Sequence, residues 1–294
     1  MTSYELFLLL DEGLIFGLIA LGVYVAFFWL RFPDLTPDGS FVLGGVLYSK
    51  ASMAGMSPIL AILIATGGGA LAGLLTASVN KVVKIPAVVS GLIVSTALYS
   101  LNWLILSKPN QYIEPSNTLV GNITGVTGAW HLFAWLLAIW AGVGIFVIKF
   151  SSSIWGLRLR AVGENTLLAR DLNISETGYT FGGLAIANGI VGLAGAMFVQ
   201  RSFSADINMG LGITIAGLAG LILGLIIASR SRVISVVVIS ILTGGIIYKT
   251  MVFLSLRLGA PPEAFRMVSS IVLVTIFAVV GTRLVTILKG IKWT

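Results

Sequence analysis

Side chains that could act in catalysis or hold a metal are scarce in this sequence. The 294 residues include no cysteine and a single histidine, His131, so neither thiolate chemistry nor a histidine-ligated metal site can be built. No nucleophile and base, and no paired carboxylates, converge in sequence. A Gly-x-x-x-x-Gly-Lys-Ser/Thr loop that would cradle ATP phosphates is also absent. We therefore expect no catalytic residue, no metal and no cofactor on the chain itself.

Two short polar segments stand out against the apolar background. The first carries Asp34, Thr36 and Asp38, and the second carries Asp206 and Asn208. An Asp at the centre of a membrane helix costs about 2.5–3.5 kcal/mol on insertion scales, so these acids need a protected polar environment. We expect the five residues to lie along a translocation path or its gate. Helix capping is the simpler interpretation for Asp38 and Asp206, whereas Asp34 favours a structural or gating role.

The composition places the chain in a membrane. Hydrophobic residues make up 57% and charged residues 10%, far from the roughly 25% charge of soluble domains. The 35 glycines lie within apolar runs, as in helices that pack closely in membranes. Pairs four residues apart, Gly69 with Gly73 and Gly220 with Gly224, favour packing within the subunit over dimer contact. The net charge of +7 comes from dispersed Lys and Arg, so nucleic acid is not an expected partner.

Hydropathy predicts an all-α, polytopic membrane protein with about 8–10 spanning or partly spanning helices. The predicted spans are Gly13–Leu30, Pro58–Val79, Pro86–Leu106, Leu132–Ile148, Tyr179–Val199, Leu211–Ser229, Val233–Ile247 and Met267–Val280. Phe41–Leu47 is too short to span alone, so it is either a short helix completed by polar flanks or a broken segment packed against protein. If it crosses, the N-terminus is outside, the C-terminus is cytoplasmic, and twelve of the 18 Lys and Arg residues are cytoplasmic.

The polar segments also suggest internal symmetry within a single permease domain, residues 1–294. Residues 33–39 and 205–210 each precede a short or glycine-interrupted apolar helix, and the topology puts them on opposite sides. This arrangement is typical of inverted repeats, here 33–106 and 205–281, whose broken helices meet at a substrate path. Two unrelated helix starts would look similar, because Asp, Thr and Asn cap helices well.

The longest polar interruption, residues 149–178, is predicted to be cytoplasmic. Within it, Asn165 or Gly163 can open a short surface helix with Leu167, Leu168 and Leu172 on one face. A connector needs only a few residues, so an amphipathic insertion of this length favours docking of a partner. A helix lying on the membrane and anchored by Arg is the alternative.

This insertion resembles the coupling loop of ABC importer permeases of the branched-chain amino acid and ribose type. The resemblance lies in Arg160-Ala161-Val162-Gly163-Glu164-Asn165, and the Asp34-Leu35-Thr36 motif, spans and length agree with it. Residues 32–41 most resemble a subgroup of tryptophan, tyrosine or other amino acid transporters, whereas Pro37-Asp38-Gly39 departs from the ribose-type pattern. By this resemblance the residues that contact the ATPase are Arg160, Gly163, Glu164, Asn165, Leu168, Ala169, Arg170 and Leu172.

The family implies a transporter subunit, not an enzyme, in the bacterial cytoplasmic (inner) membrane. Its expected partners are cytoplasmic ATPase subunits that bind the ATP, an extracytoplasmic substrate-binding protein, and a second permease subunit that we expect to be a copy of this chain. The expected cargo is a small solute, an aromatic or related amino acid. An ABC permease for a sugar or nucleoside, or a secondary transporter driven by an ion gradient, is the alternative. Dependence of uptake on ATP separates the last class from the others.

Overall fold

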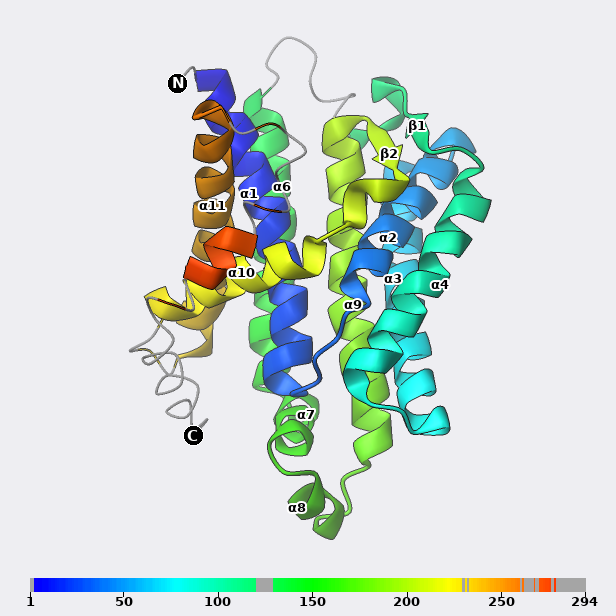
Figure 1. Ribbon diagram of the computed structural model, residues 1–294, viewed down its shortest axis with the longest axis vertical. Helices are drawn as coiled ribbons and strands as arrows, with labels where there is room; N and C mark the ends of the chain where they lie inside the picture. Colours follow the sequence, from blue (N-terminus) through cyan, green and yellow to red (C-terminus); the bar gives the residue numbers. More distant parts are fainter. Residues whose placement is uncertain are drawn as a thin grey trace.

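The chain forms a bundle of helices joined at one end by a small two-stranded sheet (Figure 1). The computed structural model describes residues 3–119, 129–228 and 233–259, together with residues 231, 261, 267, 270–275 and 278. The longer described helices are α1 (Ser3–Tyr24), α2 (Pro37–Met53), α3 (Pro58–Val83), α4 (Ala87–Leu106), α6 (Ala129–Ser151), α9 (Glu176–Ser202), α10 (Ile213–Ile227) and α11 (Ile234–Arg257). Shorter elements are the π-helix η1 (Val25–Trp29), the 3-10 helices η2 (Pro115–Asn117) and η3 (Ile207–Gly210), α7 (Ile154–Glu164), α8 (Thr166–Asp171), β1 (Asn110–Tyr112) and β2 (Ser204–Asp206).

The predicted all-α membrane class is confirmed. Among the described residues, seven helical segments are long and apolar enough to cross a bilayer. They match seven of the predicted spans, with ends that differ by several residues. Of the eighth predicted span, Met267–Val280, the structure describes residues 267, 270–275 and 278, while the end of the second candidate repeat and the C-terminus lie outside the described residues.

Helix α2 is longer than the apolar run that predicted it. The run Phe41–Leu47 lies within a 17-residue helix, Pro37–Met53, that follows a segment without regular secondary structure. Its polar positions Tyr48, Ser49 and Ser52 are buried in protein rather than facing lipid. The apolar run is therefore part of a helix completed by polar flanks, which was one of the two predicted possibilities, and those flanks are packed against protein.

Glycines bring α2, α3 and α9 into backbone contact. A Cβ on Gly69 of α3 would collide with the Asn188 carbonyl of α9, and one on Gly44 of α2 with the Gly192 carbonyl. Gly73 meets α9 in the same way at Leu184. Close backbone contact of this kind holds helices together in membranes, where the hydrophobic effect does not drive helix–helix packing. The predicted packing role of the Gly69–Gly73 pair within the subunit is confirmed.

The Gly220–Gly224 pair also packs within the subunit. In α10, a Cβ on Gly224 would lie 2.6 Å from the Ser240 carbonyl oxygen of α11, and one on Gly220 would lie 3.3 Å from the Gly245 Cα. Both glycines thus face α11, and the predicted packing role is confirmed for this pair as well.

Ion pairs show which charged residues share an end of the bundle. Each pair between described residues joins two that the predicted topology places on the same side. One end holds Arg31–Glu164, Lys81–Glu176 and Arg170–Glu176; the other holds Arg201–Asp11, Lys249–Glu12 and Arg257–Glu5. Helices α7 and α8 lie at the first end, and the β1–β2 sheet lies at the second (Figure 1).

Candidate functional site

Helices α7 and α8 project from one end of the bundle, where Figure 1 shows them below the long helices. The insertion forms two short helices rather than the single one expected. Ser153 caps α7 by accepting a hydrogen bond from the Gly156 N–H at 3.2 Å. Asn165 caps α8, and its side-chain oxygen accepts from the N–H groups of Leu167 at 3.1 Å and Leu168 at 3.0 Å. Asn165 therefore begins α8, whereas Gly163 lies inside α7.

The predicted apolar face of α8 is open to its surroundings. Leu167 is 70%, Leu168 55% and Leu172 63% exposed. Ala169 points the other way and is buried, which anchors the helix to the bundle. Gly163 also faces inward, because a Cβ there would collide with the Trp29 carbonyl at the end of η1. Ala169 and Gly163 therefore position the surface, and the leucines form it.

The three charged residues expected to meet a partner also bind within the chain. The guanidinium of Arg160 donates to the Ser151 carbonyl at 2.8 Å, and burial lowers the pKa of Arg160. Glu164 lies 3.6 Å from Arg31, and Arg170 pairs with Glu176 at 2.6 Å. Glu164 and Arg170 keep about half or more of their side chains exposed, so they can also frame a docking surface.

Asp34 and Thr36 belong to a fully buried polar network. One Asp34 oxygen accepts from the Thr36 N–H at 2.9 Å and hydroxyl at 2.5 Å, and the other accepts from the Asn188 amide at 2.7 Å. Asn188 in turn accepts from Ser40 at 2.7 Å, and the Thr36 and Thr76 hydroxyls lie 2.6 Å apart. The network ties the start of α2 to α3 and α9.

Asp38 and Asp206 both cap helix starts. Asp206 accepts from the Asn208 N–H at 2.6 Å and opens η3, the same turn geometry as Asp34 with Thr36. Asp38 caps a helix other than its own, because its carboxylate accepts from the N–H of Thr214 at 2.7 Å and of Gly212 at 3.1 Å, at the start of α10. Asp206 is the last residue of β2 and Asn208 lies in η3, and neither bonds to the buried network.

Sequence reasoning did not single out Ser40, Thr76 or Thr214. Each bonds to a residue 40 or more positions away in the chain. Ser and Thr are common in membrane helices, where they usually bond to their own backbone. No local signal therefore distinguished these three.

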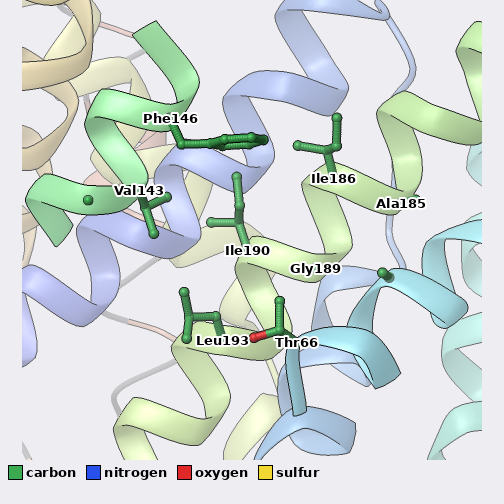
Figure 2. A pocket seen from close by; sticks show the side chains of 10 residues that line it. Thr66, Val143, Phe146, Ala185, Ile186, Gly189, Ile190 and Leu193 are labelled. Carbon is green, nitrogen blue, oxygen red and sulfur yellow. The ribbon is translucent and has the colours of Figure 1, made fainter. Parts of the chain in front are cut away.

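A cavity of about 410 Å³ lies between α3, α6 and α9 (Figure 2). Figure 2 shows Phe146, Ile186, Ile190 and Leu193 around it. Its one hydroxyl-bearing residue, Thr66, donates to the Ile62 carbonyl of its own helix at 2.8 Å. None of the ten lining residues is charged, so the cavity suits hydrocarbon and offers nothing to bind the ammonium or carboxylate of an amino acid.

Comparisons with known proteins agree with this architecture. The family model for the permease component of branched-chain amino acid transport systems matches residues 6–277. A tyrosine transport system permease protein of Clostridioides difficile is 30% identical over 270 residues, covering 92% of this chain and 89% of that protein. An uncharacterised protein of Rickettsia prowazekii is 30% identical over 218 residues, covering 73% of this chain and 75% of its own length.

A solved structure shares the fold at low sequence identity. It is an inward-facing conformation of an ABC transporter assigned to the metal-chelate type. The match has a TM-score of 0.56 at 16% identity and covers 94% of this chain and 86% of that one. At this identity the likeness concerns the fold alone.

The seven membrane-crossing segments and these matches define a multi-pass permease subunit of a transport system. The match to the family model covers most of the chain, and the tyrosine permease aligns over nearly its full length. The chain belongs to the family of permease components of branched-chain amino acid transport systems. The predicted resemblance to this family and to its amino acid subgroup is confirmed.

Proposed function

We propose that the chain is the membrane-spanning subunit of an ATP-driven importer, and that α8 docks on a cytoplasmic ATPase. The observation that carries this proposal is the exposure of Leu167, Leu168 and Leu172 on a capped helix that projects from the bundle. Burying one leucine side chain is worth about 1.5–3 kcal/mol, so three on one short helix make a strong docking surface. We call these three residues the leucine surface.

The distribution of charge supports placing this end in the cytoplasm. Lys and Arg are enriched in cytoplasmic loops, and the end that holds Arg31, Lys81 and Arg170 also carries the two arginines of α7, Arg158 and Arg160. In this orientation the chain begins outside the cell membrane and its C-terminus is cytoplasmic. The β1–β2 sheet then faces outward, where a substrate-binding protein would rest.

We propose a gating role for the five polar residues at or before the starts of α2 and α10. Asp34 and Thr36 fix the start of α2, while Asp206 and Asn208 fix the turn before α10. Asp38 joins the two helix starts. Two repeats can form a gate when the helix starts that face each other are held in defined positions, because each repeat can then move against the other as a rigid unit.

The cargo that we propose is an aromatic or related amino acid, delivered by an external binding protein to a dimer of this chain. The tyrosine transport permease that aligns over nearly the full chain supports this choice. The partner subunits bind the ATP, and this chain supplies the path.

Co-purification tests the docking role. Leu167→Asp and Leu172→Asp should each abolish retention of the cognate ATPase on the tagged permease, while Leu258→Asp should not. Leu258 is 89% exposed and follows α11 at the opposite end of the bundle, so it controls for the cost of a charge on an exposed leucine. Retention of the ATPase by both α8 variants would refute the docking role.

Uptake of labelled tyrosine into proteoliposomes tests the energy source. We expect uptake only when the ATPase, the binding protein and ATP are all present. Uptake driven by an ion gradient without ATP would favour a secondary transporter, and uptake of a sugar or nucleoside in place of tyrosine would correct the cargo.

A further inference from the structure

One carboxylate at the base of the bundle joins three helices. Glu176 is the first residue of α9, and one of its oxygens accepts a hydrogen bond from Lys81 of α3 at 2.5 Å. The other oxygen accepts from both Nη2 and Nε of Arg170 in α8, at 2.6 and 3.1 Å. One carboxylate oxygen of Glu176 thus binds α3 and the other binds α8, while Glu176 itself belongs to α9.

The position of Glu176 makes these bonds stronger than ordinary surface ion pairs. Its side chain is 18% exposed and that of Lys81 is 22% exposed, so water screens their attraction only in part. Arg170 binds through two nitrogens, which fixes its direction as well as its distance. A carboxylate in the first turn of α9 is further stabilised by the helix dipole.

The rest of α8 offers few other ties to the spans. Ala169 packs inward, and its carbonyl accepts from the Ile174 N–H at 2.9 Å, a bond within the same loop. The leucine surface points away from the bundle. The charged link to α3 and α9 is therefore the polar connection between α8 and the spans.

Helices α3 and α9 pack with their backbones in direct contact. Gly69 and Gly73 of α3 meet the carbonyls of Asn188 and Leu184 in α9, and no side chain lies between them. A force applied at the start of α9 and the end of α3 thus acts on two packed spans, and α9 is also hydrogen-bonded to the buried Asp34.

We propose that Glu176 is the positioning residue that passes movement of α8 to α3 and α9. This inference rests on the proposed function, in which an ATPase moves α8. Removing the charge should leave the leucine surface able to bind the ATPase but should loosen α8 from the spans. Hydrolysis would then continue with less transport.

The first test measures ATP hydrolysed per tyrosine transported by the reconstituted permease, ATPase and binding protein. Glu176→Gln should retain the ATPase at the wild-type level and raise this ratio roughly 5- to 100-fold, the range of a typical coupling free energy. Asp171→Asn is the matched control, since it removes an exposed carboxylate at the end of α8 and should leave the ratio unchanged. Lys81→Met should raise the ratio as Glu176→Gln does, and the double variant should be no worse than either single one.

The second test does not depend on the cargo. Because the sequence contains no cysteine, spin labels at Asp171→Cys in α8 and Val82→Cys in α3 are the only labels on the chain. Diluting the labelled permease with an excess of unlabelled copies leaves one labelled chain in a dimer, which then reports one distance. In the complex with the ATPase, this distance should have one narrow distribution both without nucleotide and after trapping with ATP and vanadate. Glu176→Gln should broaden it in both states.

An unchanged ratio together with a narrow distribution in Glu176→Gln would overturn this inference and leave the proposed function standing. Loss of ATPase retention in Glu176→Gln would also overturn it, because Glu176 would then shape the docking surface itself. Failure of the wild-type permease to retain the ATPase would overturn the proposed function first, so the two failures are distinguishable.

Discussion

The carboxylate of Asp38, in the first turn of α2, caps the start of α10 through Thr214. One Asp38 oxygen accepts from both the N–H of Thr214 at 2.7 Å and its hydroxyl at 2.6 Å, across 176 positions of sequence. The Gly210 backbone closes on the same turn, because a Cβ there would collide with the Asp38 carbonyl. Helices α2 and α10, one in each candidate repeat, thus meet start to start through a single side chain.

Replacing Asp38 with Ala should destabilise the protein by about 1–3 kcal/mol, because two N–H groups of α10 lose a charged acceptor where water is scarce. Thr214→Val removes only the hydroxyl bond and should cost less, about 1 kcal/mol. Thermal unfolding of the purified proteins in detergent ranks the stability of the two variants. Equal losses in the two variants would show that the cap on the backbone is unimportant.

Replacing Asn188 with Leu should cost about 1–3 kcal/mol or more, because Asp34 and Ser40 both lose a buried partner. The control is Thr96→Val in α4, where the exposed hydroxyl bonds only to the Leu92 carbonyl of its own helix at 2.8 Å. That variant should stay within about 0.5 kcal/mol of the wild type. The midpoint of chemical unfolding measures the stability of both variants. An Asn188→Leu variant as stable as the wild type would mean that the network does not hold α2 to α9.

Two glycines of α3 that are two residues apart should respond oppositely to alanine. Gly69→Ala forces a methyl group into the Asn188 carbonyl and should cost about 1–3 kcal/mol. Gly67→Ala meets nothing within 4 Å and should be neutral or stabilising by up to about 1 kcal/mol. The same unfolding assay compares them, and a harmless Gly69→Ala would contradict the close contact of α3 with α9.

The sequence predicted most of the fold because hydropathy and glycine spacing are local signals. Seven spans follow from apolar runs that need no partner, and Asn165, which begins α8, was one of the two helix starts that the sequence left open. The extent of α2 did not follow, because Tyr48, Ser49 and Ser52 are polar and their burial depends on neighbouring helices. Hydropathy treats such residues as the end of a span.

The candidate site was predicted in part. The leucine surface is where the 3.6-residue period placed it, but the same period did not show that Ala169 anchors α8. The links from Asp38 to Thr214 and from Glu176 to Lys81 join residues 176 and 95 positions apart. Pairings at such separations depend on the assembled bundle, and a single sequence carries no trace of them.

The orientation of α8 is the central claim of the account, and single-cysteine labelling tests it directly. The chain contains no cysteine, so Leu167→Cys in α8 and Tyr112→Cys in β1 each create one reactive site, and both positions are more than half exposed. In intact cells that express the permease without the ATPase, a membrane-impermeant maleimide should label Tyr112→Cys and leave Leu167→Cys unlabelled. Inside-out vesicles from the same cells should give the reverse. Labelling of Leu167→Cys from the cell exterior would contradict the cytoplasmic docking of an ATPase on α8.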